Sequence, residues 1–399
     1  MIINPVYILA LLYFFTNFIA MLTGIYDGGL ILEGKYFSLK EESLIYAFLM
    51  QAILILFIIV LYNYFNKKTK KHKFEFRRII GVTLLLVQIS YIIFNKSMGV
   101  NIAGDSTRLS EGSLLNYLFI LLQPDILYII IGIHLSSNRL FFANTSIYLL
   151  SMFLRGWMGG VFIVFFTILF RYNPSKISLK NLIYVFLFIL IAFLLLPMII
   201  DAKWAMRTGM SLTEFIYGIS DSFETTRYKQ SIYYILNRFQ HIGHVALLLE
   251  NSDNLYQKYI SDHFVSYWWE GLPQQTILKI SDEKYISLSS YIVTEFYNIK
   301  NPSWNINPGL SGWFFILQDK FFFLVLYLFL FVTMQFYYIS RKADSRLLTT
   351  IACFSLIYLF HGWFGAYFNI LLYSVFIILI YRFSFYLKRQ VIFNRKKSK

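Results

Sequence analysis

The chain has 399 residues, of which 58% are hydrophobic and 14% are charged, and its formal net charge at pH 7 is +15. A soluble domain carries about 25% charged residues, so this composition excludes a soluble globular protein. The single cysteine, Cys353, excludes an intramolecular disulfide. The positive charge does not indicate nucleic-acid binding, because more than half of the basic residues gather in short segments beside apolar ones.

Taken in chain order, the apolar segments predict ten membrane-spanning helices. A helix needs about 20 apolar residues to cross a hydrocarbon core of about 30 Å. Such segments lie at about 6–24, 44–64, 79–94, 113–135, 140–154, 157–171, 181–200, 316–340, 347–362 and 366–385. We therefore expect an all-α integral membrane protein. Its parts are an N-terminal region of seven spans (1–200), a large loop with helices (201–315) and a C-terminal region of three spans (316–399).

The distribution of basic residues predicts the orientation. Short cytoplasmic links carry an excess of Lys and Arg, whereas long loops are translocated largely regardless of charge. The link from Asn66 to Arg78 and the tail around Arg395 are strongly basic. We therefore expect both termini in the cytoplasm, the loop of residues 201–315 outside, and basic links that touch anionic membrane lipid.

The external loop contains the first cluster of candidate catalytic residues. Apolar residues recur at helical spacing from Ser231 to Asn251, which predicts one amphipathic helix. Arg238, His241 and His244 are three residues apart, so they would lie on one face of it. Arginine offers a fork of donors that matches phosphate oxygens, and a histidine can take a proton from a hydroxyl. The alternative is a solvated polar face; a zinc site fits less well, because no third ligand has the right spacing.

Two charged residues of the N-terminal region are candidates for a site within the membrane. Arg155 ends a short span and begins the glycine-containing link Arg155–Gly160, so it would lie near the membrane surface. It either binds a lipid diphosphate or extends to the head groups. Asp125 follows Pro124 near the middle of its span. It forms either a structural ion pair with an arginine of another helix or part of a substrate cavity.

The external loop also carries Arg207 and Arg227, which add to its positive charge. The alternative is that each is an ordinary solvated surface residue. Several familiar motifs are absent from the sequence: an Asp-x-Asp pair, a phosphate-binding loop, a His-Glu-x-x-His zinc motif and a Gly-x-Ser-x-Gly elbow. No internal cytoplasmic link is long enough to fold around a nucleotide. An enzyme of this layout needs a donor that is already activated in the lipid phase.

The layout resembles the Wzy-type oligosaccharide repeat-unit polymerases of bacterial O-antigen and capsule synthesis. The shared features are many spans with one large external loop late in the sequence, and short motifs. These motifs are Arg155-Gly156, Asn237-Arg238-Phe239, Gly271-Leu272-Pro273 and Pro308-Gly309-Leu310-Ser311-Gly312. The position after the loop proline is Gln274, where the family often has a basic or aromatic residue.

The resemblance implies a GT-C-like helical fold in the bacterial cytoplasmic membrane, with no metal and no cofactor. It implies transfer of a growing glycan from undecaprenyl diphosphate to a new lipid-linked repeat unit. Arg155 and Arg238 become diphosphate ligands, and His241 becomes the leading base, with His244 or Glu250 behind it. A chain-length regulator and a flippase are the further partners that such a role implies.

Two other functions compete with this interpretation. An O-antigen ligase-type transferase would have a similar external site and a different acceptor. A non-catalytic flippase or transporter of lipid-linked oligosaccharide would show matching helical halves, which this sequence does not.

Overall fold

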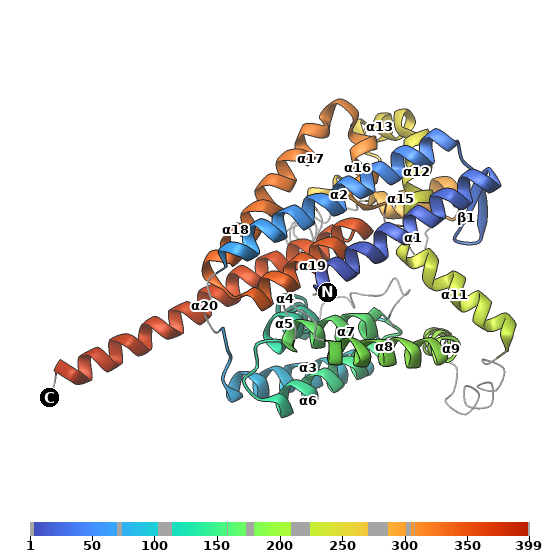
Figure 1. Cartoon of the computed structure of the whole chain (residues 1–399). Coiled ribbons are helices and arrows are strands. Elements are labelled where there is room, and N and C mark those ends of the chain that lie inside the picture. Colours follow the sequence, from blue (N-terminus) through green and yellow to red (C-terminus); the bar gives the residue numbers. More distant parts are fainter. Residues whose placement is uncertain are drawn as a thin grey trace.

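The computed structural model describes residues 4–69, 74–102, 114–157, 159–172, 179–208, 224–269, 286–300, 305–306 and 308–397. The described part is almost entirely helical (Figure 1), apart from one small antiparallel hairpin, which pairs β1 (Gly29–Leu32) with β2 (Lys35–Ser38). The fold therefore agrees with the expected helical membrane protein.

Six helical segments of the described residues are long and apolar enough to cross a membrane. They are Pro5–Asp27, Glu41–Lys68, Arg78–Met98, Leu115–Gly132, Gly309–Lys342 and Phe364–Phe383, and Gly159–Tyr172 and Ser345–His361 are shorter apolar helices. The total of about ten spans stays a prediction. The GT-C-like arrangement and the three-part division of the chain also stay predictions. One helix, Leu196–Thr208, continues past the expected boundary at residue 200.

The first two long helices, α1 (Pro5–Asp27) and α2 (Glu41–Lys68), form a hairpin that is closed by β1 and β2. The Asn4 side chain accepts a hydrogen bond from the backbone N–H of Val6 and caps α1, and Pro5 fits the first helical turn. Gly28 ends α1 at φ 68°, a left-handed conformation that glycine adopts without strain.

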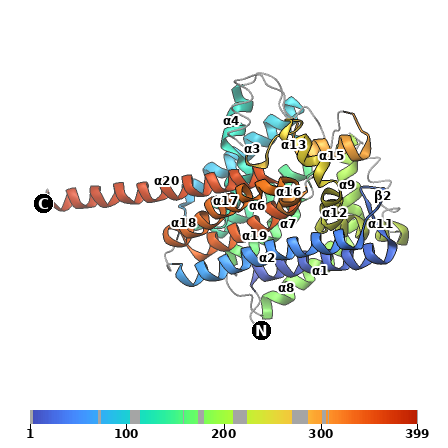
Figure 2. The same cartoon turned by 90° about the horizontal axis from the view of Figure 1, so that it is seen from above.

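A second group of helices lies beside this hairpin (Figures 1 and 2) and comprises α3 (Arg78–Met98), α4 (Leu114–Leu122), α5 (Pro124–Gly132), α6 (Asn138–Leu154) and α7 (Gly159–Tyr172). The predicted span 113–135 is interrupted between α4 and α5. Gln123 adopts φ 44° there, and the following proline cannot donate to the helical ladder. Helices α8 (Leu179–Leu194) and α9 (Leu196–Thr208) follow.

The loop expected outside the membrane contributes helices that pack into the bundle. Its described elements are α11 (Thr225–Phe239), α12 (Ile242–Glu250), α13 (Ser252–Ile260), the 3-10 turn η2 (Tyr267–Trp269) and α15 (Leu288–Tyr297). Helix α12 contacts α2 and also α16 (Gly309–Leu317). In η2, Tyr267 is buried against Trp313, while Trp268 is half exposed.

The last elements include α19, the most buried helix of the described structure. They are η3 (Gln318–Lys320), α17 (Phe321–Tyr327), the π-helical turn η4 (Leu328–Thr333), α18 (Met334–Lys342), α19 (Ser345–His361) and α20 (Phe364–Lys397). Every residue of α19 from Leu347 to His361 is buried, and α19 contacts α1, α2, α7, α16, α18 and α20. Helix α20 projects from the bundle in both views (Figures 1 and 2).

A polar network ties three links together at the start of α19. Asp344 caps α19 and binds His134 (Nε2–Oδ1 3.0 Å) and Arg346 (Nε–Oδ2 3.0 Å). Arg346 also pairs with Glu75 at 3.9 Å, and Phe76 forms a β-bridge with Leu135. The α2–α3, α5–α6 and α18–α19 links therefore meet at one end of the bundle, as alternating spans require.

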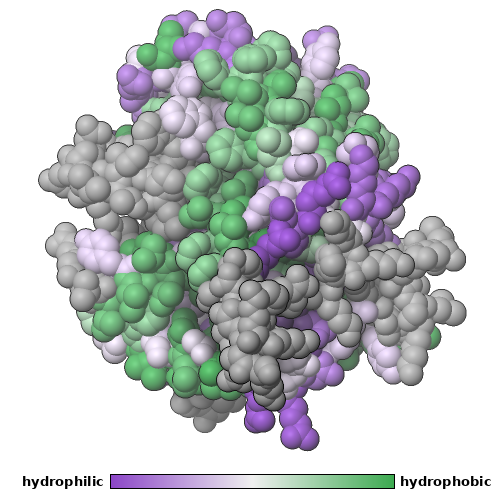
Figure 3. Space-filling view, turned by 90° about the vertical axis from the view of Figure 1, so that its left-hand side faces the viewer, coloured by the Kyte–Doolittle hydropathy of each residue, from purple (hydrophilic) through white to green (hydrophobic). Residues whose placement is uncertain are grey.

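The outside of the bundle carries many exposed apolar side chains, which is typical of a surface in contact with lipid. Leu56, Leu86, Phe322 and Phe376 are each more than half exposed. Figure 3 views the side that lies on the left of Figure 1 and shows hydrophobic surface crossed by a band of hydrophilic residues.

Candidate functional site

The candidate site forms where α11 ends and α12 begins. The sequence predicted one helix from Ser231 to Asn251, and this is wrong, because the chain is extended at Gln240. Asn17 of α1, which is buried, stabilises the break. Its amide donates to the carbonyl of Phe239 (3.1 Å) and accepts from the N–H of His241 (3.0 Å). Arg238 therefore lies in the last turn of one helix, and His241 is the N-cap of the next.

A chain of hydrogen bonds runs from this break into the bundle. His241 Nε2 lies 2.5 Å from Nδ1 of His361, the last residue of α19. Nε2 of His361 lies 2.8 Å from the hydroxyl of Tyr13 on α1. The ring of Trp363 stacks on His361 at 4.8 Å. The other ring nitrogen of His241, Nδ1, is shielded from solvent and has no partner among the described residues.

Burial keeps His241 and His244 neutral at pH 7, because it lowers the pKa of both. Burial, and then His361, His244 and Arg238, hold the pKa of His241 well below its usual value. Burial and then Arg238 lower the pKa of His244 to about 4. His244 Nε2 lies 3.4 Å from the Tyr297 hydroxyl, which itself donates to the carbonyl of Leu32. A neutral imidazole has one nitrogen that can accept a proton, and an anion bound nearby would raise these pKa values.

Arg238 supplies the exposed positive charge beside the histidines. Its side chain is 52% exposed and pairs with Glu33 of the β1–β2 turn at 3.7 Å, and its guanidinium lies over the ring of Tyr234. An exposed ion pair of this length is weak, so an anion can replace Glu33. The N-terminus of α12 adds the partial positive charge of a helix dipole. The break is therefore electropositive.

The other pair of predicted residues, Arg155 and Asp125, forms an ion pair. Arg155 ends α6 and is only 5% exposed, and its Nη2 lies 2.9 Å from both carboxylate oxygens of Asp125. Its Nε donates to the Ser151 carbonyl, and its Nη1 donates to the Tyr91 hydroxyl. The ion-pair alternative for Asp125 is thus present, and Arg155 reaches a diphosphate only by exchanging Asp125 for it.

The two groups border the same end of α19. The Asp125 carboxylate lies within electrostatic range of Tyr358. The ring of Tyr358 is 6.1 Å from that of Trp363, which stacks on His361. Aromatic side chains thus separate the ion pair from the histidines.

Two predicted residues, Glu250 and Arg227, lie apart from these groups in the structure. Glu250 lies at the far end of α12 from His241, about 13 Å along the axis, and accepts a hydrogen bond from the N–H of Lys40. Arg227 is exposed in the first turn of α11, whereas Arg238 is in its last turn. Arg207 lies near the end of α9, and its side chain is outside the described part.

The loop motif Gly271-Leu272-Pro273, with Gln274, also falls outside the described residues. The motif from Pro308 to Gly312 begins α16, whose residues Gly309–Trp313 are buried. Gly309 has φ 69° and packs against the carbonyl of Phe360 in α19. Sequence reasoning missed Tyr13, Asn17 and His361, whose only signal was a polar group inside an apolar segment.

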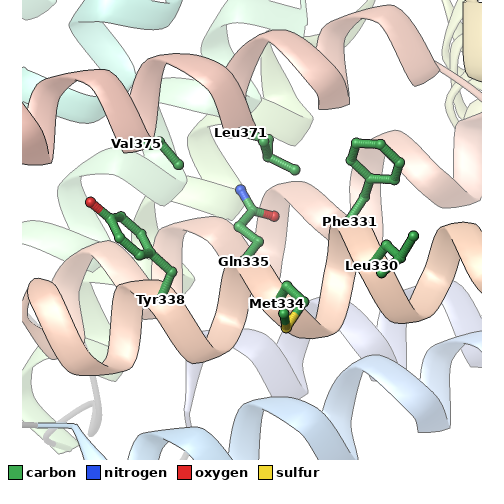
Figure 4. A pocket seen from close by; sticks show the side chains of 7 residues that line it. All are labelled: Leu330, Phe331, Met334, Gln335, Tyr338, Leu371 and Val375. Carbon is green, nitrogen blue, oxygen red and sulfur yellow. The ribbon is translucent and has the colours of Figure 1, made fainter.

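A separate cavity of about 170 Å³ lies between η4, α18 and α20 (Figure 4). It is lined by Leu330, Phe331, Met334, Gln335, Tyr338, Leu371 and Val375. Oε1 of Gln335 accepts a hydrogen bond from Tyr367, and its Nε2 has no partner in the described structure. The lining offers neither a carboxylate nor a cation, so it is a poor candidate for chemistry. Among the described residues, no group of three or more His, Cys, Asp or Glu is arranged to hold a metal.

Comparison of the chain with protein-family models, curated proteins and solved structures found no match.

Proposed function

We propose that this protein polymerises lipid-linked oligosaccharide repeat units on the outer face of the bacterial cytoplasmic membrane. The growing glycan moves from undecaprenyl diphosphate to the non-reducing end of a new lipid-linked unit. The observation that carries the proposal is the cluster of Arg238, His241 and His244 at the break between α11 and α12, at one end of a membrane bundle.

The cluster suits the chemistry of this transfer. The anomeric C–O bond to the diphosphate breaks, and a new C–O bond forms to the acceptor hydroxyl, which loses its proton. Arg238 and the positive N-terminus of α12 would stabilise the negative charge of the leaving diphosphate. A neutral histidine of the cluster would take the proton, which contributes about 10²–10⁴-fold to the rate. Neither step calls for a metal or a nucleotide.

The depth of the site also supports a lipid-linked substrate. Helix α19 has 17 residues and is about 25 Å long. It begins at the Asp344 network, where three links meet, and ends at His361. A hydrocarbon core is about 30 Å thick, so His361 would lie close to the opposite membrane boundary. That is where the diphosphate of a membrane-embedded polyprenyl lipid would sit.

The distribution of glycan lengths in cells that carry Arg238→Ala tests the proposal, with membrane insertion confirmed. Lys229→Ala is the matched control, because it removes an exposed cation from the other end of α11. We expect long polymer to vanish in the Arg238 variant, while single repeat units still reach the surface. A wild-type ladder would refute the role of Arg238. Loss of single units as well would indicate a flippase or a ligase.

A further inference from the structure

We infer that Tyr13 and His361 hold His241 in the tautomer whose proton is on Nδ1, so that His241 is a hydrogen-bond donor to a phosphate oxygen and not the catalytic base. The inference deepens the proposed function and rests on it for the identity of the ligand. It follows from the order of protons along the chain Tyr13–His361–His241.

With both rings neutral, the chain has two possible proton orders. In the first, the Tyr13 hydroxyl donates to Nε2 of His361, Nδ1–H of His361 donates to Nε2 of His241, and the proton of His241 is on Nδ1. In the second, every bond is reversed, and Nδ1 of His241 is bare.

The surroundings favour the first order. Tyr13 has no exposed surface, and the only hydrogen-bond partner of its hydroxyl among the described residues is His361. In the second order, this O–H has no acceptor, and Nδ1 of His241 has no donor. The first order leaves only one buried group unpaired, the Nδ1–H of His241. Because unpaired buried polar groups are costly, the order with fewer of them prevails.

The unpaired Nδ1–H suits an oxyanion. Arg238 lies within electrostatic range of His241, His244 and His361, so the N–H is in a positive environment. The His241 residue is partly exposed although its Nδ1 is shielded from solvent, so an oxyanion reaches the N–H only after a neighbouring side chain moves aside. A phosphate oxygen accepts such a hydrogen bond, whereas a sugar hydroxyl that must lose its proton needs a bare nitrogen.

His244 is then left as the base. The Tyr297 hydroxyl donates to the carbonyl of Leu32, so it accepts from Nε2–H of His244. Nδ1 of His244 is therefore the nitrogen without a proton. Tyr13 and His361 are positioning residues, since they act through His241.

Nitrogen-15 NMR of the full-length protein, labelled at its six histidines and held in lipid nanodiscs, tests the inference. The shift of each ring nitrogen distinguishes a protonated from a bare atom, and His241→Asn identifies the signals of His241. We expect a protonated Nδ1 at neutral pH. Tyr13→Phe leaves the two proton orders with equal numbers of unpaired groups, so Nδ1 should become a mixture. Tyr7 is on the same helix as Tyr13, and its hydroxyl donates to Asn63 of α2, so Tyr7→Phe should change nothing.

Inorganic pyrophosphate is the probe for the ligand. We expect it to shift the Nδ1–H signal of His241 in the wild type and not in Arg238→Ala. A bare Nδ1 in the free protein, or an unchanged signal in Tyr13→Phe, would overturn the tautomer. A signal that pyrophosphate does not move would overturn the oxyanion ligand. These results do not depend on glycan synthesis, so a failure of the proposed function is recognised separately, by a normal ladder of glycan lengths in Arg238→Ala.

Discussion

Replacing Asn17 by leucine should destabilise the protein strongly, because this side chain serves two backbone groups at the break between α11 and α12. The N–H of His241 and the carbonyl of Phe239 would both lose their bond to Asn17, which is 1% exposed. A buried polar group left unpaired costs about 1–3 kcal/mol. Two groups in the lower part of that range predict a loss of about 2–4 kcal/mol in the free energy of unfolding.

The measurement is unfolding of the purified protein in mixed micelles of increasing SDS content, followed by tryptophan fluorescence. Thr16→Val is the matched control. The Thr16 hydroxyl bonds chiefly within α1, to the carbonyl of Leu12 at 2.8 Å, and reaches Phe239 only at 3.4 Å. We expect Thr16→Val to cost less than about 1 kcal/mol, the usual net value of one hydrogen bond. Equal effects of the two substitutions would refute the role of Asn17.

Three further predictions concern stability in the same assay. Asp125→Leu leaves the charge of the buried Arg155 without its partner and should lower the free energy of unfolding by about 3–5 kcal/mol. The double variant Asp125→Leu, Arg155→Met should lose less stability. An equal or larger loss in the double variant would contradict this prediction. His244 has a pKa of about 4 when folded and about 6.5 when unfolded. Because the folded state binds fewer protons, its stability should be full above pH 6.5 and should fall by about 3 kcal/mol towards pH 4. His244→Asn should flatten this pH dependence. An unchanged slope in the variant would refute the prediction. Gly309→Ala would place Cβ 2.3 Å from the Phe360 carbonyl oxygen at φ 69° and should cost at least about 1–3 kcal/mol, whereas Gly159→Ala, whose Cβ meets nothing within 4 Å, should be tolerated.

The long apolar helices were predictable, because hydropathy alone determines which segments a bilayer accepts. Pro5–Asp27, Glu41–Lys68 and Arg78–Met98 contain the first three predicted spans. The interruption at Gln123 was only partly visible, since Pro124 indicated a kink but not a left-handed residue before it.

The site was less accessible to sequence reasoning. Spacing drew attention to Arg238, His241 and His244, but it suggested one helix, because local periodicity does not register a partner 224 residues away such as Asn17. The same holds for His361, 120 residues beyond His241. The ion pair of Asp125 with Arg155 was one of two alternatives, and only the packing of α5 against α6 distinguishes them.

The long sequence separations within the hydrogen-bonded chain also bear on how the protein is made. Tyr13 and His361 are 348 residues apart, so a ribosome completes the loop histidines well before their partner on α19. Until α19 enters the membrane, α1 lacks a helix that packs against it, and the ring of His241 lacks its partner His361. The unfinished bundle would therefore expose the Tyr13 hydroxyl to lipid or to the translocation machinery. Assembly of the site is then a late event in biogenesis, and truncation before α19 would leave an incomplete bundle for cellular quality control to recognise.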